Sequence, residues 1–258
     1  MRLATWNVNS VRSRLDALVP WLAATRPDVV VLQELKVQQG EFPFAEIAMT
    51  GYQVALVGQK TYNGVAVLAR QPIAVRATSL DDGADDPQAR LIDCEVAGLR
   101  VVSVYVPNGG EPGSDKYAYK LQWLRRLRAW LDRTCAPCEA LAIGGDWNIA
   151  PDDLDVRYPA AWKDTVLCTP EVRRAWRGLC QWGLCDAARA VHPEARMFSW
   201  WDYRAAGLER NDGLRIDHWL VTAPLRDRLV AAGVDQDLRH GDKPSDHAPV
   251  WIELAGGG

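Results

Sequence analysis

Residues 140–149, with the sequence ALAIGGDWNI, constrain the fold of this chain more than any other stretch. A short apolar run closed by two glycines is typical of a buried strand. Gly144 and Gly145 lack a Cβ, so another backbone, a ligand or a metal can approach closely there. Asp146 and Asn148 lie two residues apart, which in an extended chain places both side chains on one face. The pair suits a hard cation or a positioned water, and it also suits an ordinary turn that ends a strand.

Polar residues follow apolar runs elsewhere in the chain too. Residues 3–8 predict a first strand that carries Asn7, and residues 29–32 (VVVL) predict a buried strand that leads to Glu34. A Glu after such a run is seldom buried without a partner. It is either a solvated strand end or, if Asn7 lies on the neighbouring strand, a cation ligand.

Three later segments repeat this arrangement. Tyr105 ends a predicted strand, where its valine neighbours are equally consistent with a core tyrosine, and Asn108 follows in a Pro-Gly loop. Asp217 closes the segment GLRID at 213–217. The segment SDH at 245–247 leads into a last predicted strand at 250–254. Polar side chains therefore collect at strand ends, where a layered α/β fold presents its site.

The order of the predicted elements favours an α/β (α+β) protein with mixed sheets and helices outside. Strand–helix units stand beside strand pairs that resemble hairpins, such as 52–57 with 64–69 and 91–96 with 99–106. Such a mixture argues against a purely parallel sheet. No repeat, linker or composition shift marks a boundary, so we expect a single domain over residues 1–258.

The chain is not basic overall, so its net charge gives no sign of nucleic-acid binding. The formal net charge is −3, so any polyanion site must be a local patch, helped by a bound cation. Candidate basic segments, each equally readable as a solvated helix face, are Arg12 with Arg14, residues 120–128, residues 173–177, and Arg204 with Arg210. Tyr62 lies in a loop at 58–63 that suits either a phosphate or a plain hairpin tip.

The six cysteines predict reduced thiols and a cytoplasmic protein. Cys135 and Cys138 form a CxxC, but no second CxxC and no nearby His complete a zinc site. We expect no redox role for them. The N-terminus lacks the apolar core of a signal peptide, and no apolar run is long enough to cross a membrane.

The strand-end residues together suit metal-assisted hydrolysis of a phosphodiester. Carboxylates and an amide hold a hydrated Mg²⁺, a His paired with an Asp stabilises developing charge, and a remaining Asp takes a proton from water. The residues of this set are Asn7, Glu34, Tyr105, Asp146, Asn148, Asp217, Asp246 and His247.

Six motifs resemble the exonuclease III family of AP endonucleases, and they occur in that family's order. They are TWNVN (5–9), QELK (33–36), YVPNG (105–109), GGDWNI (144–149), GLRID (213–217) and SDH (245–247). Each motif is weak alone, and six in order over nearly the whole chain are a strong signal. The stretch SWWDYR (199–204) before GLRID resembles the DNA-repair branch of the family.

This resemblance implies a four-layered α/β sandwich in which two facing sheets are flanked by helices. It implies Mg²⁺-dependent incision 5′ to abasic sites, with Mn²⁺ able to substitute, and 3′-phosphodiesterase, 3′-phosphatase and 3′→5′ exonuclease activities in base excision repair. The substrate would be double-stranded DNA with abasic sites or with blocked or recessed 3′ ends. The protein would be a monomer without membrane contact, associated with the nucleoid through DNA.

The resemblance also assigns roles to residues. Glu34 resembles the chief metal ligand, Asp146 the residue that activates water, and His247 the phosphate contact that Asp217 orients. The cation would lie among Asn7, Glu34, Asp146, Asn148, Asp246 and His247. Asn148 would orient the water and the phosphate, and Tyr105 would contact the phosphate. The DNA contacts would be Arg12, Tyr62, Asn108, Trp200, Arg204, Leu214 and Ile216.

Trp200, Leu214 and Ile216 fall where the family builds an apolar pocket for a flipped-out abasic sugar. Leu214 replaces a Trp of some relatives, so the shape of this pocket and the balance of activities stay open. A regulatory protein without catalysis and a lipid or inositol phosphatase are the alternatives. The intact Glu34, Asp146, Asn148 and His247 argue against the first, and unrecognisable substrate loops argue against the second.

Overall fold

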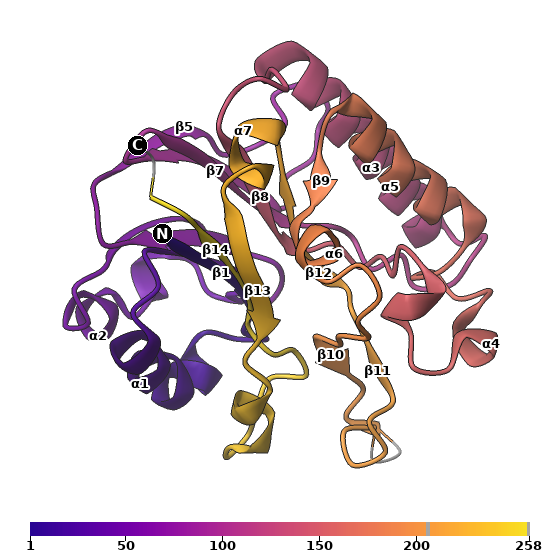
Figure 1. Cartoon of the computed structure of the whole chain (residues 1–258). Coiled ribbons are helices and arrows are strands. Elements are labelled where there is room, and N and C mark those ends of the chain that lie inside the picture. Colours follow the sequence, from indigo (N-terminus) through magenta and orange to yellow (C-terminus); the bar gives the residue numbers. More distant parts are fainter. Residues whose placement is uncertain (205–206, 257–258) are drawn as a thin grey trace.

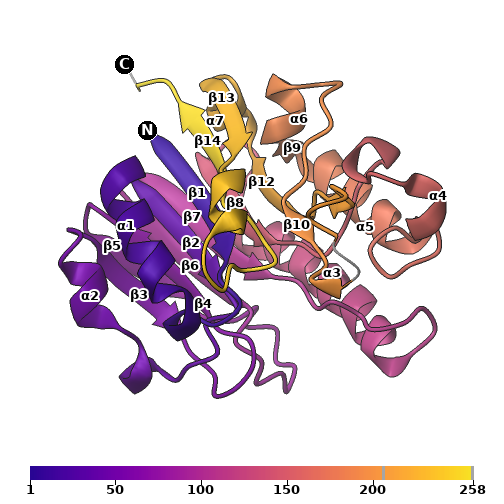
Figure 2. The same ribbon diagram turned by 90° about the horizontal axis from the view of Figure 1, so that it is seen from below.

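Two six-stranded β-sheets pack face to face at the centre of the protein, in a computed structural model that describes residues 1–204 and 207–256. Helices cover the outer face of each sheet, α1 and α2 on one side and α3 and α5 on the other (Figures 1 and 2). The four layers confirm the predicted α/β sandwich of facing mixed sheets.

The first sheet contains both ends of the described chain. Its strand order is β13 (Leu229–Val234), β14 (Val250–Leu254), β1 (Arg2–Asn7), β2 (Val29–Gln33), β4 (Val65–Ala69) and β3 (Gln53–Val57). Strands β1 and β2 run parallel because α1 (Leu15–Thr25) crosses between them, and the other pairs are antiparallel.

The second sheet has the same mixed character. Its order is β5 (Ile73–Ala77), β6 (Leu91–Val96), β7 (Leu99–Tyr105), β8 (Leu141–Asp146), β12 (Asp217–Val221) and β9 (Cys185–Asp186). The long helix α3 (Asp115–Thr134) joins the parallel pair β7 and β8. A short ribbon of β10 (Trp200–Trp201) and β11 (Gly213–Leu214) stands beside it.

Short elements connect these layers. The remaining α-helices are α2 (Phe44–Ala48), α4 (Pro159–Trp162), α5 (Pro170–Trp182), α6 (Ala187–Val191) and α7 (Ala223–Arg226). Single 3₁₀ turns are η1 (Arg12–Arg14), η2 (Gln39–Glu41), η3 (Asp153–Asp155) and η5 (Gln236–His240). No helix in residues 1–204 and 207–256 is long and apolar enough to cross a membrane.

The central strands β1, β2 and β4 of the first sheet are buried on both faces, which explains their continuous apolar sequence. In β2, Val29 and Val31 belong to the core between the two sheets, while Val30 and Leu32 pack beneath α1. This alternation follows from the two-residue period of a strand. One chain segment therefore contributes to two apolar layers, and a third lies between the second sheet and helices α3 and α5.

Helix α5 illustrates how the local sequence sets an outer layer. Thr169 accepts a hydrogen bond from the Val172 backbone at the N-terminus, Pro170 occupies the first turn, and Gly183 ends the helix in a left-handed conformation. The buried residues Val172, Trp176 and Leu179 recur at helical spacing.

The glycine pair of the central motif serves the protein's own packing. A Cβ on Gly145 would lie 1.9 Å from the carbonyl oxygen of Val104 on β7, and one on Gly144 would lie 2.6 Å from the ring of Trp219. The close neighbours of these two glycines are therefore the Val104 backbone and the Trp219 side chain, not a ligand or a metal.

We therefore predict that Gly145→Ala lowers the free energy of unfolding by about 3 kcal/mol or more, because the clash involves backbone. Gly178→Ala is the matched control, since this α5 glycine has open space around its Cβ position. The control should gain about 0.5–1 kcal/mol. Urea unfolding of both variants measures this, and equal stabilities would contradict the packing explanation.

Candidate active site

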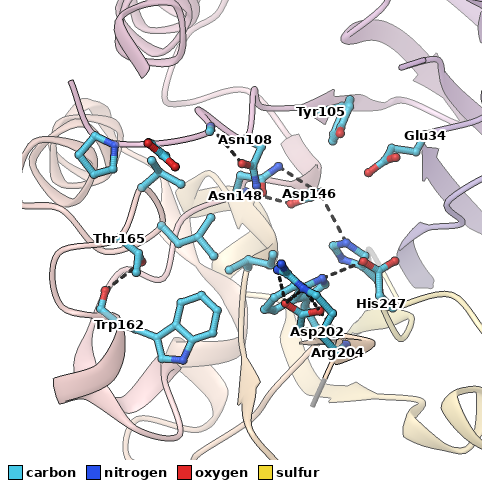
Figure 3. A pocket seen from close by; sticks show the side chains of 18 of the residues that line it. Glu34, Tyr105, Asn108, Asp146, Asn148, Trp162, Thr165, Asp202, Arg204 and His247 are labelled. Atoms are coloured by element: carbon cyan, nitrogen blue, oxygen red, sulfur yellow. Dashed lines mark hydrogen bonds and ion pairs between the residues drawn. The ribbon is translucent and has the colours of Figure 1, made fainter. Parts of the chain in front are cut away.

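The predicted polar residues converge where strands from both sheets end. Asn7 ends β1 and Glu34 follows β2 in the first sheet. Tyr105 ends β7 and Asp146 ends β8 in the second. Carboxyl ends of adjacent parallel strands lie at the same edge of a sheet, so the two facing sheets bring the four side chains together. Figure 3 shows three of them, Glu34, Tyr105 and Asp146.

Glu34, Asp146 and His247 form the centre of the site. One ligand atom from each lies within 4.8 Å of the others. Asn7 joins the two acids, because its Nδ2 donates to Glu34 Oε1 and to Asp146 Oδ2, at 2.9 Å in both cases. Carboxylate oxygens from two acids, with an imidazole beside them, fit a hard divalent cation, and Asn7 holds the two acids together.

The two acids differ in charge state. Burial, followed by repulsion from Asp217 and Glu34, raises the pKa of Asp146 to about 7, against the pull of His247 and the hydrogen bond from Asn7. Burial also acts against ionised Glu34. There, however, the Lys36 ammonium at 2.9 Å and the Asn7 hydrogen bond outweigh burial and lower the pKa. Glu34 is therefore a permanent anion and Asp146 a base poised near neutrality.

His247 is held by a buried acid. Its Nδ1 donates to Asp217 Oδ2 at 2.9 Å, and Ser199 Oγ donates to the same oxygen at 2.6 Å. Burial opposes the charged ring, but the carboxylates of Asp217, Asp146 and Asp246 outweigh it and raise the pKa of His247 to about 10. The imidazolium Nε2 lies 3.8 Å from Asp146 Oδ2. The ring is thus a fixed cationic donor that faces the candidate cation site.

The loop after β8 gives Asn148 its orientation. Asn148 adopts a left-handed backbone (φ 49°), and its N–H donates to Asp146 Oδ1 at 2.9 Å. Its amide Nδ2 donates to the Val106 carbonyl, and its Oδ1 accepts from Asn108 Nδ2 at 3.0 Å. Asp146, Asn148 and Asn108 therefore form one connected row along the site.

Lys120 of α3 is a functional candidate that the sequence analysis missed. It is fully buried, and its ammonium donates to the carbonyl oxygens of Asn148 (2.6 Å), Val166 (2.8 Å) and Asn108 (3.1 Å). Burial lowers its pKa to about 7. Its segment, residues 120–128, is readable from sequence either as a local polyanion patch or as a solvated helix face. The spacing of Lys120 from Tyr117 and Leu124 on the buried face of the helix was the signal for burial.

Arg90 was also missed. Its guanidinium lies 4.7 Å from the Tyr105 ring centroid and donates to the Tyr105 carbonyl at 3.0 Å. Burial, reinforced by the charges of Glu34 and Asp146, raises the pKa of Tyr105 well above its usual value. Tyr105 is therefore a neutral hydroxyl beside the two acids, and Arg90 is a cation behind it.

Asp246 lies at the edge of the central group. One carboxylate oxygen accepts from Asn9 Nδ2 at 2.9 Å and the other from Trp200 Nε1 at 3.0 Å. The β10 backbone pairs with this segment, because Trp200 bridges to His247 and the Trp201 N–H donates to the Asp246 carbonyl. The short ribbon thus fixes the loop that carries Asp246 and His247.

A cavity of about 490 Å³ opens onto these residues. Trp162 and Trp200 meet edge to face in its wall, with ring centroids 5.8 Å apart, and Leu167 and Ile216 add apolar surface. Leu214 is fully buried and is absent from the lining, because it lies in the apolar cluster against which Trp200 packs. The predicted pocket residues Trp200 and Ile216 therefore reach the cavity, and Leu214 supports it from behind.

The other predicted DNA contacts lie farther out. Arg204 borders the cavity but is largely exposed and paired with Asp202. Exposed Tyr62 lines a second hollow of about 570 Å³, which shares Tyr105 and Asn108 with the first and also contains Arg90. Exposed Arg12 donates to the Glu41 carbonyl and lines neither hollow. The structure does not bring these three residues together.

A family model described as the endonuclease/exonuclease/phosphatase family matches residues 4–247. The chain belongs to this family. It is 36% identical to exodeoxyribonuclease III of Haemophilus influenzae, over 98% of this chain and all of that protein. It is 27% identical to the DNA repair nuclease APEX1 of Danio rerio, over 99% of this chain and 82% of that protein. The predicted resemblance to the exonuclease III family is confirmed.

Solved structures of the endonuclease/exonuclease/phosphatase family show the same fold. An AP endonuclease from Archaeoglobus fulgidus matches with a TM-score of 0.95 at 39% identity, covering 98% of this chain and 99% of that one. A Neisseria 3′ phosphatase, NExo, bound to a product DNA hairpin matches with a TM-score of 0.93 at 40% identity, covering 99% of this chain and 100% of that one.

We predict that Asp217→Asn lowers the pKa of His247 from about 10, because the nearest anion beside the ring is lost. Asp246→Asn is the comparison variant and should lower it less, since that acid contributes less to the shift. An NMR titration of the histidine ring signals in metal-free protein measures both. A His247 pKa that stays near 10 in Asp217→Asn would contradict the pairing.

Proposed function

We propose that this protein is a DNA repair nuclease of the exonuclease III type. It hydrolyses the phosphodiester 5′ to abasic sites in double-stranded DNA and processes 3′ ends by 3′-phosphodiesterase, 3′-phosphatase and 3′→5′ exonuclease action. One observation carries the proposal: Asn7 joins Glu34 and Asp146 beside the protonated His247, at the mouth of a cavity with an apolar wall. The names of the relatives support the same class.

In this proposal, the residues at the centre of the site have different chemical roles. A Mg²⁺ ion held by Glu34 with Asp146 and Asn7, for which Mn²⁺ can substitute, would neutralise charge on the phosphate and the leaving oxygen. Asp146, a buried acid whose pKa is about 7 in the metal-free protein, takes the proton of the attacking water. His247 donates from Nε2 to a phosphate oxygen and stabilises its developing charge, while Asp217 fixes the ring.

The surrounding polar groups position the substrate in this proposal. Asn148 orients the water and the phosphate, held in place by Asn108 and Lys120. Tyr105 donates a hydrogen bond to a phosphate oxygen, since its raised pKa keeps the hydroxyl protonated. Asp246 supports the cation from the edge of the site. Trp200 and Ile216 exclude a normal base from the cavity by shape.

The remaining elements of the proposal concern the whole molecule. We propose that residues 1–258 form one domain, since the family model spans most of the chain. We also propose that the protein acts as a monomer. The contacts to DNA would be Arg12, Tyr62, Asn108, Trp200, Arg204, Leu214 and Ile216, with Leu214 acting through Trp200. The bacterial relative supports action on chromosomal DNA in the cytoplasm.

A duplex with one tetrahydrofuran abasic analogue tests the proposal. It is incubated with Mg²⁺ or with EDTA, beside undamaged duplexes with a recessed 3′ end and with a 3′-phosphate. We expect incision 5′ to the analogue that EDTA abolishes, and the other duplexes rank the 3′-end activities. Tight binding without cleavage of any duplex would overturn the proposal and indicate a non-catalytic relative.

We predict that Asp146→Asn and His247→Ala each lower kcat by about 10²- to 10⁴-fold with the fold intact, because each removes a proton-transfer or charge-stabilising group. Single-turnover cleavage of the abasic duplex measures the loss. Asp132→Asn, an exposed acid on α3, is the control and should leave kcat unchanged. Near-normal turnover in either site variant would contradict its assigned role.

We also predict that Glu34→Gln raises the Mg²⁺ concentration needed for half-maximal cleavage, because a permanently charged ligand is lost. A Mg²⁺ titration of the initial rate measures this, with Glu41→Gln as an exposed control. An unchanged requirement in Glu34→Gln would remove this residue from the cation site.

A further inference from the structure

Three polar side chains interrupt the apolar layer between the two sheets. Thr5 on β1, Gln33 on β2 and Ser103 on β7 are all fully buried. Their faces follow from the strand period, because Leu3, Val31 and Val101, each two residues earlier, belong to the core between the sheets. The three side chains therefore point from both sheets into the same interior.

Hydrogen bonds join these side chains into a bridge across the interior. Thr5 Oγ1 donates to Gln33 Oε1 at 3.2 Å, and Gln33 Nε2 donates to Ser103 Oγ at 3.2 Å. Ser103 Oγ returns to the first sheet by donating to the Leu32 carbonyl at 3.3 Å. We call Thr5, Gln33 and Ser103 the inter-sheet bridge. It links β1 and β2 of one sheet to β7 of the other.

Stability does not account for the inter-sheet bridge. A typical internal hydrogen bond adds only about 0.5–1.5 kcal/mol net. The Gln33–Ser103 bond lies at the long end of the normal range, and the two hydroxyl bonds, at 3.2 and 3.3 Å, are longer than the usual range of about 2.5–3.0 Å. Replacing both partners of a buried polar contact by apolar groups of similar shape is often neutral or stabilising. An all-apolar layer at this point would hold the sheets together at least as well.

The position of the bridge points to the site instead. Gln33 is the last residue of β2 and directly precedes Glu34. Ser103 lies two residues before Tyr105 and pairs with Gly144, which lies two residues before Asp146. The bridge thus joins the sheets next to the point where Glu34 of one sheet meets Tyr105 and Asp146 of the other.

The backbone bonds of Glu34 tie it to its own sheet and not to the facing one. Its backbone turns into the left-handed region (φ 51°) after the last β2–β4 pair, Gln33 with Val65, and its carbonyl accepts from the Ser10 N–H at 2.8 Å. Its position relative to the second sheet therefore depends on contacts between the sheets. Apolar contacts are non-directional, whereas hydrogen bonds have a preferred length and direction. Ligands of a cation site must be held within about 0.5 Å of their productive geometry.

We propose that Gln33 is a positioning residue for the cation site. With Thr5 and Ser103 it fixes the spacing and register of the two sheets where Glu34 and Asp146 meet, and it serves cation affinity rather than stability. The inference rests on the proposed function in one respect, which is that this site binds a divalent cation. It adds a residue that touches neither substrate nor cation.

The test replaces the whole bridge by apolar groups of similar size, in the variant Thr5→Val, Gln33→Met, Ser103→Ala. Urea unfolding gives its stability, and the EPR signal of free Mn²⁺ gives its Mn²⁺ affinity without DNA or turnover. We expect stability equal to or above wild type and an Mn²⁺ dissociation constant raised about 10-fold or more. Cleavage should recover at high Mn²⁺ concentration.

Thr222→Val is the matched control. Thr222 is equally buried, and its hydroxyl donates to the Glu139 carbonyl at 2.6 Å, at the opposite end of β12 from Asp217. This variant should lose stability and keep the Mn²⁺ affinity of wild type. The triple variant should therefore lose Mn²⁺ affinity and keep its stability, whereas Thr222→Val should lose stability and keep its Mn²⁺ affinity.

Two results would overturn the inference. One is wild-type Mn²⁺ affinity in the triple variant. The other is a loss of stability as large as that of Thr222→Val alongside weaker binding. Gln33→Met alone supplies the same two measurements if the triple variant does not fold. A wild-type protein that binds no Mn²⁺ at this site would instead refute the cation site of the proposed function.

Discussion

The structure depends on holding two buried acids, Glu34 and Asp146, close together although like charges repel. Neither sheet alone could do this, because each acid ends a strand of a different sheet and the packing of the sandwich fixes their separation. The compensation of these charges by Asn7, Lys36 and His247 is partial, because burial above all still raises the pKa of Asp146. A divalent cation is the group that would complete it.

A second layer of buried charge supports the site from behind. Arg215 is fully buried and donates to Asp155 at 2.8 Å and to both oxygens of Asp186, at 2.8 and 3.0 Å. It lies two residues before Asp217, in a connection outside both flanking strands. Loss of one partner would leave an uncompensated buried charge. Such networks fix the backbone beneath Asp217 where the sheet ladder is interrupted.

Sequence patterns predicted the site residues that directly follow buried strands. Apolar runs marked the strand ends that carry Asn7, Glu34 and Asp146, and two glycines closed the run before Asp146. The resemblance supplied the family. The exposed edge strands β5 and β13 were not predicted, because they carry no long buried run. An edge strand lacks one of the two packing partners that give a central strand its apolar sequence.

The surroundings of side chains that act through tertiary contacts could not be predicted from the sequence. Lys120 looked like one more solvated cation, and only the structure shows three carbonyl groups around its ammonium. Leu214 was expected in the cavity, but it is fully buried in the apolar cluster against which Trp200 packs. A Lys on a helix can be solvated or buried, and a Leu near a site can line the cavity or lie in the core. The packing of segments distant in sequence decides which of the two occurs.

The place of β14 in the first sheet has a consequence for how the protein is made. This strand, near the C-terminus, lies between β13 and the N-terminal β1, and Ser245 just before it donates to the Asn7 carbonyl at 2.7 Å. A ribosome-bound chain that lacks this part has an unpaired edge on β1 and no His247. Since contacts so distant in sequence form late, the candidate site is complete only after residues 245–254 have joined the first sheet.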